Sequence, residues 1–400
     1  MKCVVPICLS LIMSLFVTVG TKPNGDGNIP EVSLNAPSAV AVREAPSEEV
    51  ITISSFDKME FDGKLRLPSG GEVPKLVIFV NGSGPNTYDN HRSTGGKEFN
   101  YFDLFANEFN RRGIAFFSYN TRGVKPDKTP PYYASIDKDA YQTYKPSNQV
   151  KDVECIIRQL KSIEALKNAK VYLLGWSEGS FIAPLVAKNG NVPVDALLLA
   201  GYMNGSMAET LEWQQSGGSS MVFYRQYFDY DGNGNISPKE FSEDRYQLQS
   251  YLGATFEQID MNGDGILNEA DFALLLAENR KAVFAAFEGG DDEWLAKNYP
   301  VMLTSDWYLD FATLPTNRET LPALDLPIHI FHGVYDANVS IEGVHDIEAA
   351  FKAQGKTNLT THVFDNADHD LNYIEFVTKG TIPEGIQSIF TVSELLDAGN

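Results

Sequence analysis

The chain has 400 residues, a hydrophobic content of 43 % and a formal net charge of −21. That length exceeds what one compact core usually holds and predicts two folding units, while the ordinary hydrophobic content excludes a wholly disordered chain. The strong negative charge argues against a nucleic acid or an anionic membrane surface as a partner.

The N-terminal residues 1–20 have the pattern of an export signal. Lys2 supplies one positive charge, and an apolar run without charges follows it as far as Val19. This run is shorter than the roughly 20 residues that span a bilayer, so we expect cleavage on export rather than stable membrane insertion. The mature protein is then expected to be secreted or periplasmic. Residues 21–47 are rich in Pro, Asn, Gly and Ala and are predicted to form a flexible leader.

Short continuous apolar runs alternate with helical patterns in two stretches of the chain, 48–203 and 319–400. Such runs are typical of buried parallel strands, and the alternation predicts an α/β fold with a mostly parallel central sheet and helices on both sides. The predicted strands are 76–80, 114–119, 171–174, 196–200, 328–331 and 360–364.

The alternation stops after Ala200 and resumes at about Leu321. We interpret 204–318 as an insertion that forms a mainly helical cap. It holds 19 acidic against 7 basic side chains, a net charge of −12. A segment that leaves the sheet there passes over the carboxyl ends of the strands. We therefore expect it to form a lid, in which the aromatic side chains of 294–311 either line a substrate pocket or pack on the core.

The decisive segment is a predicted buried strand that runs into Gly-Trp-Ser-Glu-Gly, 175–179, followed by a helical pattern. The glycines on either side of Ser177 allow a sharp turn that exposes the serine oxygen at the start of a helix. A serine hydroxyl is a weak nucleophile that needs a base, and the base needs a carboxylate to orient it. Ser177 is therefore the predicted nucleophile.

Three histidines are candidates for the base: His345 in a probable helix, His362 inside a predicted strand, and His369 in the polar loop that follows that strand. A loop at the carboxyl end of a strand is the expected place of a catalytic base, which favours His369. Asp336 follows the preceding strand and is the predicted acid. Asp365 and Asp368 are closer to the histidine in sequence but less well placed to hold its ring.

Two backbone amides are expected to stabilise the oxyanion. One belongs to Glu178, directly after the nucleophile. The other should come from the loop 81–85, whose sequence is Asn-Gly-Ser-Gly-Pro. Ser83 is the preferred donor there, with Gly82 as a close alternative.

Five segments now form a recognisable set, in the order 61–68 (FDGKLRLP), 81–85 (NGSGP), 119–123 (YNTRG), 174–179 (LGWSEG) and 332–336 (HGVYD). Together they resemble the α/β-hydrolase superfamily, near its dienelactone-hydrolase-like and acyl-esterase members. The resemblance covers the two sheet segments and not the insertion. It implies hydrolysis of a carboxylic ester, thioester or amide by the triad Ser177, Asp336 and His369. Asn81 and Trp176 stand where the family usually or often has histidine, which concerns the shape of the substrate rather than the chemistry.

Two loops of the insertion, 229–240 and 260–271, match the twelve-residue calcium loop of the EF-hand superfamily and resemble a pair of such hands. Glycines at the sixth position make the sharp turn, and Ile236 is expected to bridge to the partner loop. We predict two structural Ca²⁺ ions, the second bound more weakly because Asp271 is shorter than the usual glutamate. The predicted ligands are Asp229, Asp231, Asn233, Asn235 through its carbonyl, Glu240, Asp260, Asn262, Asp264, Ile266 through its carbonyl, and Asp271.

The sequence therefore predicts a secreted serine hydrolase that cleaves a carboxylic ester or thioester of a small acyl substrate through an acyl-enzyme on Ser177, with a calcium-stabilised cap. Two alternatives remain open: a peptidase or amidase on the same fold, and a calcium-dependent binding protein on an inactive hydrolase scaffold.

Overall fold

The computed structural model of the protein describes residues 45–71 and 73–396. The predicted export signal 1–20 and nearly all of the predicted leader 21–47 lie outside these described residues. The leader boundary needs one correction, because Ser47 is already the first residue of a strand.

The centre of the fold is an eight-stranded sheet. The six strands β6, β3, β9, β10, β11 and β12 run parallel to one another, whereas β1 and β2 are antiparallel to their neighbours. Residues along β3 alternate between the two faces: Leu76, Ile78 and Val80 enter one core cluster, and Val77 and Phe79 enter another. This burial on both faces explains why the parallel strands have continuous apolar sequences. In sheet order the strands are β1 Ser47–Ser54, β2 Glu60–Leu67, β6 Ile114–Tyr119, β3 Lys75–Val80, β9 Lys170–Trp176, β10 Ala196–Ala200, β11 Ile328–Gly333 and β12 Leu359–Phe364.

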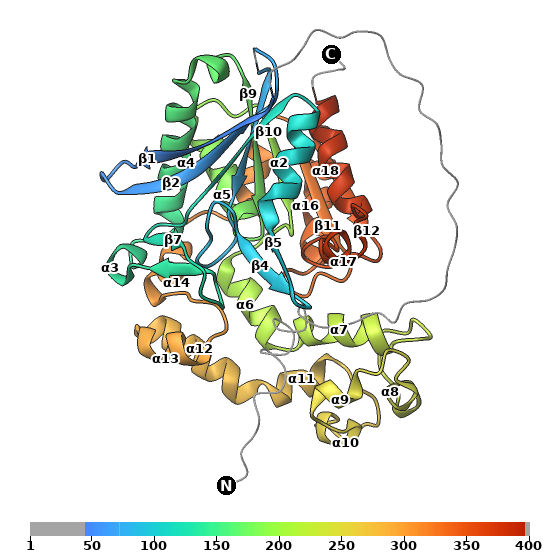
Figure 1. Ribbon diagram of the computed structural model, residues 1–400. Helices are drawn as coiled ribbons and strands as arrows, with labels where there is room; N and C mark the ends of the chain where they lie inside the picture. Colours follow the sequence, from blue (N-terminus) through green and yellow to red (C-terminus); the bar gives the residue numbers. More distant parts are fainter. Residues whose placement is uncertain (1–44, 72, 397–400) are drawn as a thin grey trace, which may run out of the picture.

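Helices cover both faces of this sheet, as predicted (Figure 1). The helices α2 (Tyr101–Arg111) and α18 (Glu384–Leu395) pack on one face, and α4 (Pro146–Lys161), α5 (Gly179–Asn189) and α16 (Glu342–Ala353) pack on the other. Shorter helices complete the core: α3 Lys138–Tyr141, η2 Glu164–Leu166, α15 Asn317–Thr320, η3 Leu321–Ala323 and α17 Ile374–Lys379.

Three pairs of antiparallel strands are absent from the sequence prediction. One is β1 with β2, and the others are β4 (His91–Thr94) with β5 (Lys97–Asn100) and β7 (Val124–Pro126) with β8 (Ala134–Ile136). Most side chains of β1 are exposed. Its apolar residues Val50, Ile51 and Ile53 are too few and interrupted to form the continuous run that marks a buried parallel strand.

The segment between β10 and β11 forms a cap, which Figure 1 shows below the sheet. Its second half packs on the main core through Phe287, Trp307 and Phe311, whereas the two predicted calcium loops enclose a separate apolar cluster that includes Ile236 and Leu267. The cap helices are α6 Met207–Gln215, α7 Gly218–Phe228, α8 Pro238–Glu243, α9 Gln249–Leu252, α10 Phe256–Ile259, α11 Glu269–Leu275, α12 Ala277–Gly289, α13 Asp292–Asn298 and α14 Ser305–Phe311.

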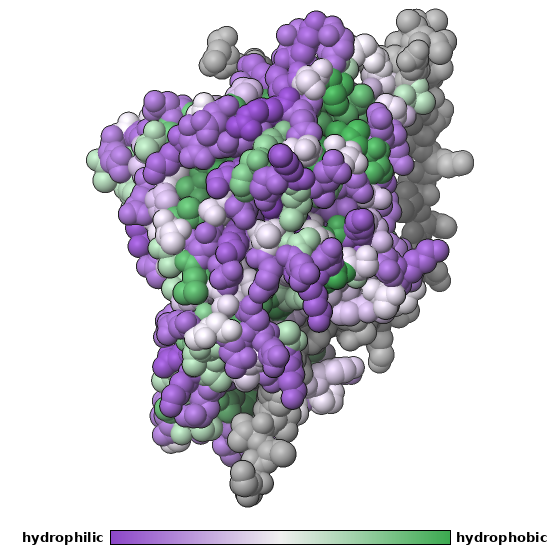
Figure 2. Space-filling view, turned by 90° about the vertical axis from the view of Figure 1, so that its left-hand side faces the viewer, coloured by the Kyte–Doolittle hydropathy of each residue, from purple (hydrophilic) through white to green (hydrophobic). Residues whose placement is uncertain are grey.

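The described part of the chain shows no feature of a membrane-spanning helix. Hydrophilic residues cover most of the face shown in Figure 2, where the hydrophobic ones form scattered patches. Among residues 45–71 and 73–396, none of the helices combines the length and the apolar character needed to cross a bilayer.

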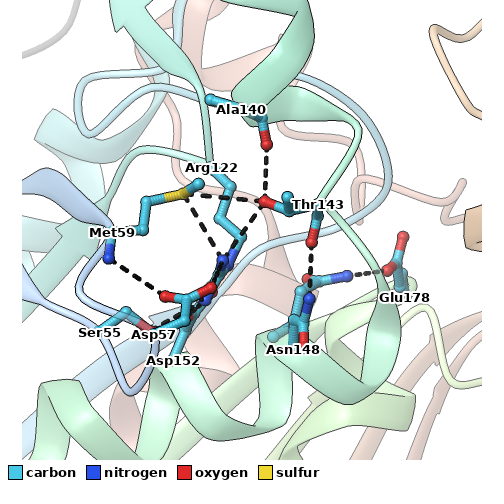
Figure 3. Close-up of polar contacts among 10 residues, drawn as sticks. Ser55, Asp57, Met59, Arg122, Ala140, Thr143, Asn148, Asp152 and Glu178 are labelled. Atoms are coloured by element: carbon cyan, nitrogen blue, oxygen red, sulfur yellow. Dashed lines mark hydrogen bonds and ion pairs between the residues drawn. The ribbon is translucent and has the colours of Figure 1, made fainter.

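A buried ion-pair cluster joins three segments at one side of the sheet (Figure 3). Arg122, in the loop after β6, is 2 % exposed and binds both carboxylate oxygens of Asp152 on α4, each at 2.6 Å. It also donates to Asp57 at 2.6 Å and to the Ser55 hydroxyl at 2.9 Å, both in the turn between β1 and β2. Burial alone lowers the pKa of Arg122, but its bonds and charge contacts with Asp152 and Asp57 raise it above the ordinary value. These contacts support a structural role for Arg122.

We predict that Arg122→Met lowers the free energy of unfolding by about 3–5 kcal/mol, because it leaves the Asp152 carboxylate buried without its partner. Denaturant-induced unfolding followed by circular dichroism measures this change. The matched control is Arg280→Met, which breaks an exposed pair with Glu212 (2.9 Å) and should cost at most about 1 kcal/mol. Equal losses in the two variants would contradict the prediction.

Candidate active site

Ser177 lies at a sharp turn between β9 and α5, in a backbone conformation that only close packing can hold. Its φ is +55°, a left-handed value that costs a residue with a side chain about 1–3 kcal/mol. A Cβ on Gly179 would overlap the carbonyl of Val80, and a Cβ on Gly175 would overlap the carbonyl of Gly179. Both flanking positions therefore require glycine. The turn 175–179, called the serine elbow below, is held against the end of β3.

The loop after β3 lies next to this serine. A Cβ on Gly82 would be 3.3 Å from the Cβ of Ser177. The Gly84 amide is engaged, since it donates to the Tyr144 hydroxyl at 3.1 Å. Ser83 and Glu178, the two expected oxyanion donors, line the same cavity as Ser177.

His369 is in the loop after β12, and its imidazole Nδ1 is 2.8 Å from Oδ2 of Asp336, in the loop after β11. The other oxygen of Asp336 accepts the backbone amides of Asn338 and Val339, each at 2.8 Å. Both side chains are buried. These bonds hold the ring with Nε2 directed away from the carboxylate, and His369 lines the cavity that contains Ser177. The structure thus pairs His369 with Asp336 and places His369 and Ser177 in the lining of one cavity.

The two other candidate histidines lie elsewhere. His345 is on α16 with a side chain that is 55 % exposed, and His362 on β12 contacts the ring nitrogen of His329 at 3.2 Å. Neither lines the cavity that contains Ser177.

The charges around His369 favour its protonated form. Burial lowers the pKa of the imidazole, but the charge of Asp336, its hydrogen bond, and the charges of Asp370 and Asp368 outweigh burial and raise the pKa to about 8. For Asp336, burial raises the pKa, while the charge of His369 and the bonds to the carboxylate bring it below the ordinary value. At neutral pH the acid is therefore ionised.

Two positions that the sequence analysis did not identify hold this pair in place. Gly201, directly after β10, has φ +55°, and a Cβ there would be 2.6 Å from Cε1 of His369. His332 is fully buried at the end of β11, accepts the Tyr202 amide at Nδ1 (3.1 Å) and donates from Nε2 to the carbonyl of Val339 (3.1 Å). The available signals for His332 were its position directly after a predicted strand and its place at the start of the segment 332–336.

The cavity over Ser177 has a volume of about 370 Å³ and is lined by residues of both the sheet domain and the cap. Of the aromatic residues in 294–311, Tyr299 and Trp307 line it, whereas Phe311 packs into the core. A second cavity of about 470 Å³ shares residues with the first, among them Arg92 and Asp370. The cap residues of the first cavity are Met207, Thr210, Leu211, Gln214, Tyr299, Pro300, Val301, Leu303 and Trp307.

The two predicted calcium loops are folded so that their carboxylates converge. Ligand atoms of Asp229, Asp231 and Glu240 lie within 4.8 Å of one another, as do those of Asp260, Asp264 and Asp271. Gly234 and Gly265, at the sixth positions, have φ of +84° and +85°. Ile236 and Leu267 pair through two backbone hydrogen bonds of 3.0 and 2.8 Å.

The remaining predicted ligands lie in the same two turns. The amide of Asn233 donates to Asp231 at 3.0 Å, and that of Asn235 donates to the side chain of Asn233 at 2.8 Å. In the second loop the Asn262 side chain is 2.9 Å from Asp264, which also accepts the Ile266 amide. A set of oxygen ligands of this kind, in which carboxylates predominate, fits Ca²⁺.

The serine elbow, the acid–histidine pair and the largely parallel sheet are consistent with one class of protein. The chain belongs to the alpha/beta hydrolase fold family, whose model matches residues 75–376. A search of curated protein sequences found no match.

Similar solved structures share low identity with the chain. An esterase from Exiguobacterium antarcticum is 16 % identical with a TM-score of 0.43, and the alignment covers 86 % of this chain and 98 % of that one. An esterase from Pyrococcus furiosus is 12 % identical with a TM-score of 0.46, at 88 % and 91 % coverage. The acylaminoacyl peptidase from Pyrococcus horikoshii is 12 % identical with a TM-score of 0.46, and the match covers 88 % of this chain but 42 % of the peptidase.

We predict that the imidazole of His369 titrates with a pKa of about 8 and that Asp336→Asn lowers this pKa, because the amide removes the negative charge that favours the protonated ring. Nitrogen-15 NMR titration of labelled histidine measures both values. The circular dichroism spectrum of the variant provides the control, since it should match that of the native protein. An unchanged His369 titration in the variant would refute the assignment of Asp336 as its partner.

Proposed function

We propose that the protein is a serine hydrolase that cleaves a carboxylic ester or thioester through an acyl-enzyme on Ser177. The observation that carries the proposal is the hydrogen bond of 2.8 Å between His369 and Asp336 beside the cavity into which the strained Ser177 turn opens. An inactive scaffold has no physical need to keep these three side chains in this arrangement.

The proposed reaction follows from this geometry. His369 takes the proton of the Ser177 hydroxyl through Nε2 as the oxygen attacks the acyl carbon, while Asp336 holds the other side of the ring. The carbonyl oxygen becomes an oxyanion, which accepts the amides of Glu178 and Ser83. His369 then gives its proton to the leaving alcohol or thiol. Water, activated in the same way, hydrolyses the acyl-serine and regenerates the hydroxyl.

The walls of the cavity suggest the class of substrate. Met203, Met207, Leu211 and Trp307 present apolar side chains next to Ser177, which suits an apolar acyl group. Arg92 and Asp370, which also line the cavity, are paired with each other at 3.0 Å, so neither leaves an uncompensated charge for a charged substrate. We therefore propose uncharged esters or thioesters with an apolar acyl part.

We predict that Ser177→Ala abolishes hydrolysis of such esters without changing the fold, and that a fluorophosphonate probe labels the native protein at Ser177. A screen of short- and long-chain p-nitrophenyl esters and aminoacyl amides, with mass spectrometry of the labelled peptide, measures both. His369→Ala should lose activity by a similar factor, with the non-adjacent His345→Ala as the control. Full turnover by Ser177→Ala would refute the mechanism, and faster cleavage of amides than of esters would favour the peptidase alternative.

We propose further that the two cap loops each bind one Ca²⁺ as a structural ion. Support comes from the convergence of three carboxylates in each loop and from the separate apolar cluster that the loops enclose. Without a cation these carboxylates repel one another. Bound Ca²⁺ would remove that repulsion and fix the directions of α7, α8, α10 and α11, with no part in the chemical step.

We predict that chelation lowers the melting temperature and reduces activity on bulky esters more than on small ones. If each site binds with a dissociation constant of about 10⁻⁴ M, as extracellular sites of this kind can, then 1 mM Ca²⁺ adds about 1.4 kcal/mol of stability per occupied site. Glu240→Gln should reproduce part of the effect of chelation, and Glu243→Gln, outside the loop, should not. Calorimetry with and without EGTA measures the melting temperature, and ester assays under the same two conditions measure the activity. Identical melting curves and substrate profiles would overturn the proposal.

We propose that the protein is exported after removal of residues 1–20, on the strength of the short uncharged apolar run that follows Lys2. The intact mass of protein recovered outside the cytoplasm measures the cleavage. Retention of Met1 in that material would contradict the proposal.

A further inference from the structure

The carboxylate of Glu178, directly after the nucleophile, is buried and surrounded by hydrogen-bond donors. The residue is 1 % exposed. Its Oε2 accepts the Tyr144 hydroxyl at 2.9 Å, and its Oε1 accepts the indole Nε1 of Trp307 at 3.1 Å and the side-chain amide of Gln149. The Ser83 hydroxyl also bonds to this carboxylate. The mechanism proposed above uses the amide of Glu178 and leaves this side chain without a role.

These four donors come from three different parts of the molecule. Ser83 belongs to the loop after β3, and Tyr144 bonds to the same loop by accepting the Gly84 amide at 3.1 Å. Gln149 is on α4 of the sheet domain. Trp307 is on α14, in the half of the cap that packs on the main core. One carboxylate thus connects the serine elbow, the loop with the second oxyanion donor, and the cap.

The chemistry of the donors requires a carboxylate rather than an amide at this position. All four groups direct a hydrogen atom at Glu178, and an amide there would direct hydrogen atoms at some of them. Burial raises the pKa of Glu178, while the bonds from Ser83, Gln149, Trp307 and Tyr144 oppose that rise. Leaving a buried donor or acceptor without its partner costs about 1–3 kcal/mol, so the cap and the loop are both held to this carboxylate.

We propose, on the basis of the hydrolase function proposed above, that the Glu178 side chain is a positioning group that holds the two oxyanion-binding amides in place when the cap is docked through Trp307. The elbow supplies one of these amides and also carries the carboxylate, whereas the loop of Ser83 supplies the other amide and donates to that carboxylate. A displacement of either amide weakens the bond to the oxyanion much more than the binding of a neutral substrate. The docking of the cap is thereby coupled to stabilisation of the transition state.

A purely structural role for the same bonds would have a different signature. Loss of packing alone lowers the melting temperature and leaves the ratio of transition-state to ground-state affinity unchanged. Loss of positioning changes that ratio, because one missing oxyanion donor costs about 100- to 1,000-fold in kcat. The informative measurement therefore compares an oxyanion mimic with a substrate of the same acyl chain.

The test uses the full-length protein with Ca²⁺ present and three variants, Glu178→Gln, Trp307→Phe and Tyr144→Phe. The readouts are kcat and KM for a short p-nitrophenyl ester, and the inhibition constant of a trifluoromethyl ketone that adds to Ser177 as an oxyanion. We expect Glu178→Gln to lower kcat and weaken the ketone about 10- to 100-fold, with KM changed less than threefold. Trp307→Phe should give a smaller change of the same kind. Tyr144→Phe removes one hydroxyl and keeps the measurement possible if Glu178→Gln does not fold.

The matched control is Trp294→Phe, which changes a tryptophan of the same half of the cap that does not line the cavity over Ser177. It should leave kcat and the ketone affinity as they are. The double variant Glu178→Gln, Trp307→Phe should lose less than the sum of the two single losses, since both substitutions disturb the same group of bonds around residue 178. Additive losses, or a ketone affinity equal to that of the native protein in every folded variant, would overturn the inference.

Failure of the function itself gives a separate result. If the fluorophosphonate probe does not label Ser177 in the native protein, the proposed hydrolase is wrong. If Ser177 is labelled and Ser177→Ala is inactive while Glu178→Gln and Tyr144→Phe keep the native ketone affinity, only the role of Glu178 is wrong.

Discussion

The arrangement of the whole site depends on a backbone contact at the serine elbow that leaves no room for a side chain. The backbone of Gly179 lies against the carbonyl of Val80, and that of Gly175 lies against the carbonyl of Gly179. This contact joins the turn after β9 to the end of β3, so Ser177 and the loop 81–85 are neighbours. The left-handed conformation of Ser177, with φ +55°, persists because two buried parallel strands and α5 hold both sides of the turn.

Three buried carboxylates around this centre are satisfied in three different ways. Asp152 is paired with the guanidinium of Arg122. Asp336 accepts hydrogen bonds from His369 and from two backbone amides. Glu178 accepts hydrogen bonds from uncharged side chains, including the Tyr144 hydroxyl. A buried carboxylate without such partners would be strongly destabilising. Each one therefore joins the segments that donate to it, and Asp336, which bonds to the imidazole, also raises the pKa of His369.

The cap consists of two parts with different attachments. The half with α12 and α14 shares the core of the sheet domain, whereas the two acidic loops enclose their own apolar cluster. The proposed Ca²⁺ ions would hold the second part, and the bond from Trp307 to Glu178 holds the first part at the site. Helix α6, which carries Met207 and Leu211 of the cavity wall, packs against α7 and links the part with the acidic loops to the cavity.

The sequence by itself determined the parallel strands, the serine turn, the position of His369 after a strand, and the two acidic loops. Each of these is encoded within a dozen neighbouring residues: a continuous apolar run, a pair of glycines, or oxygen ligands at fixed intervals. Only the tertiary structure revealed that β1 is a strand with mostly exposed side chains, that Gly201 leaves room for the imidazole ring, and which donors the Glu178 carboxylate accepts. Those partners lie 34 and 129 residues away in the chain at Tyr144 and Trp307. Contacts over such separations arise from the packing of the sheet, the loops and the cap, and no local pattern in the sequence records them.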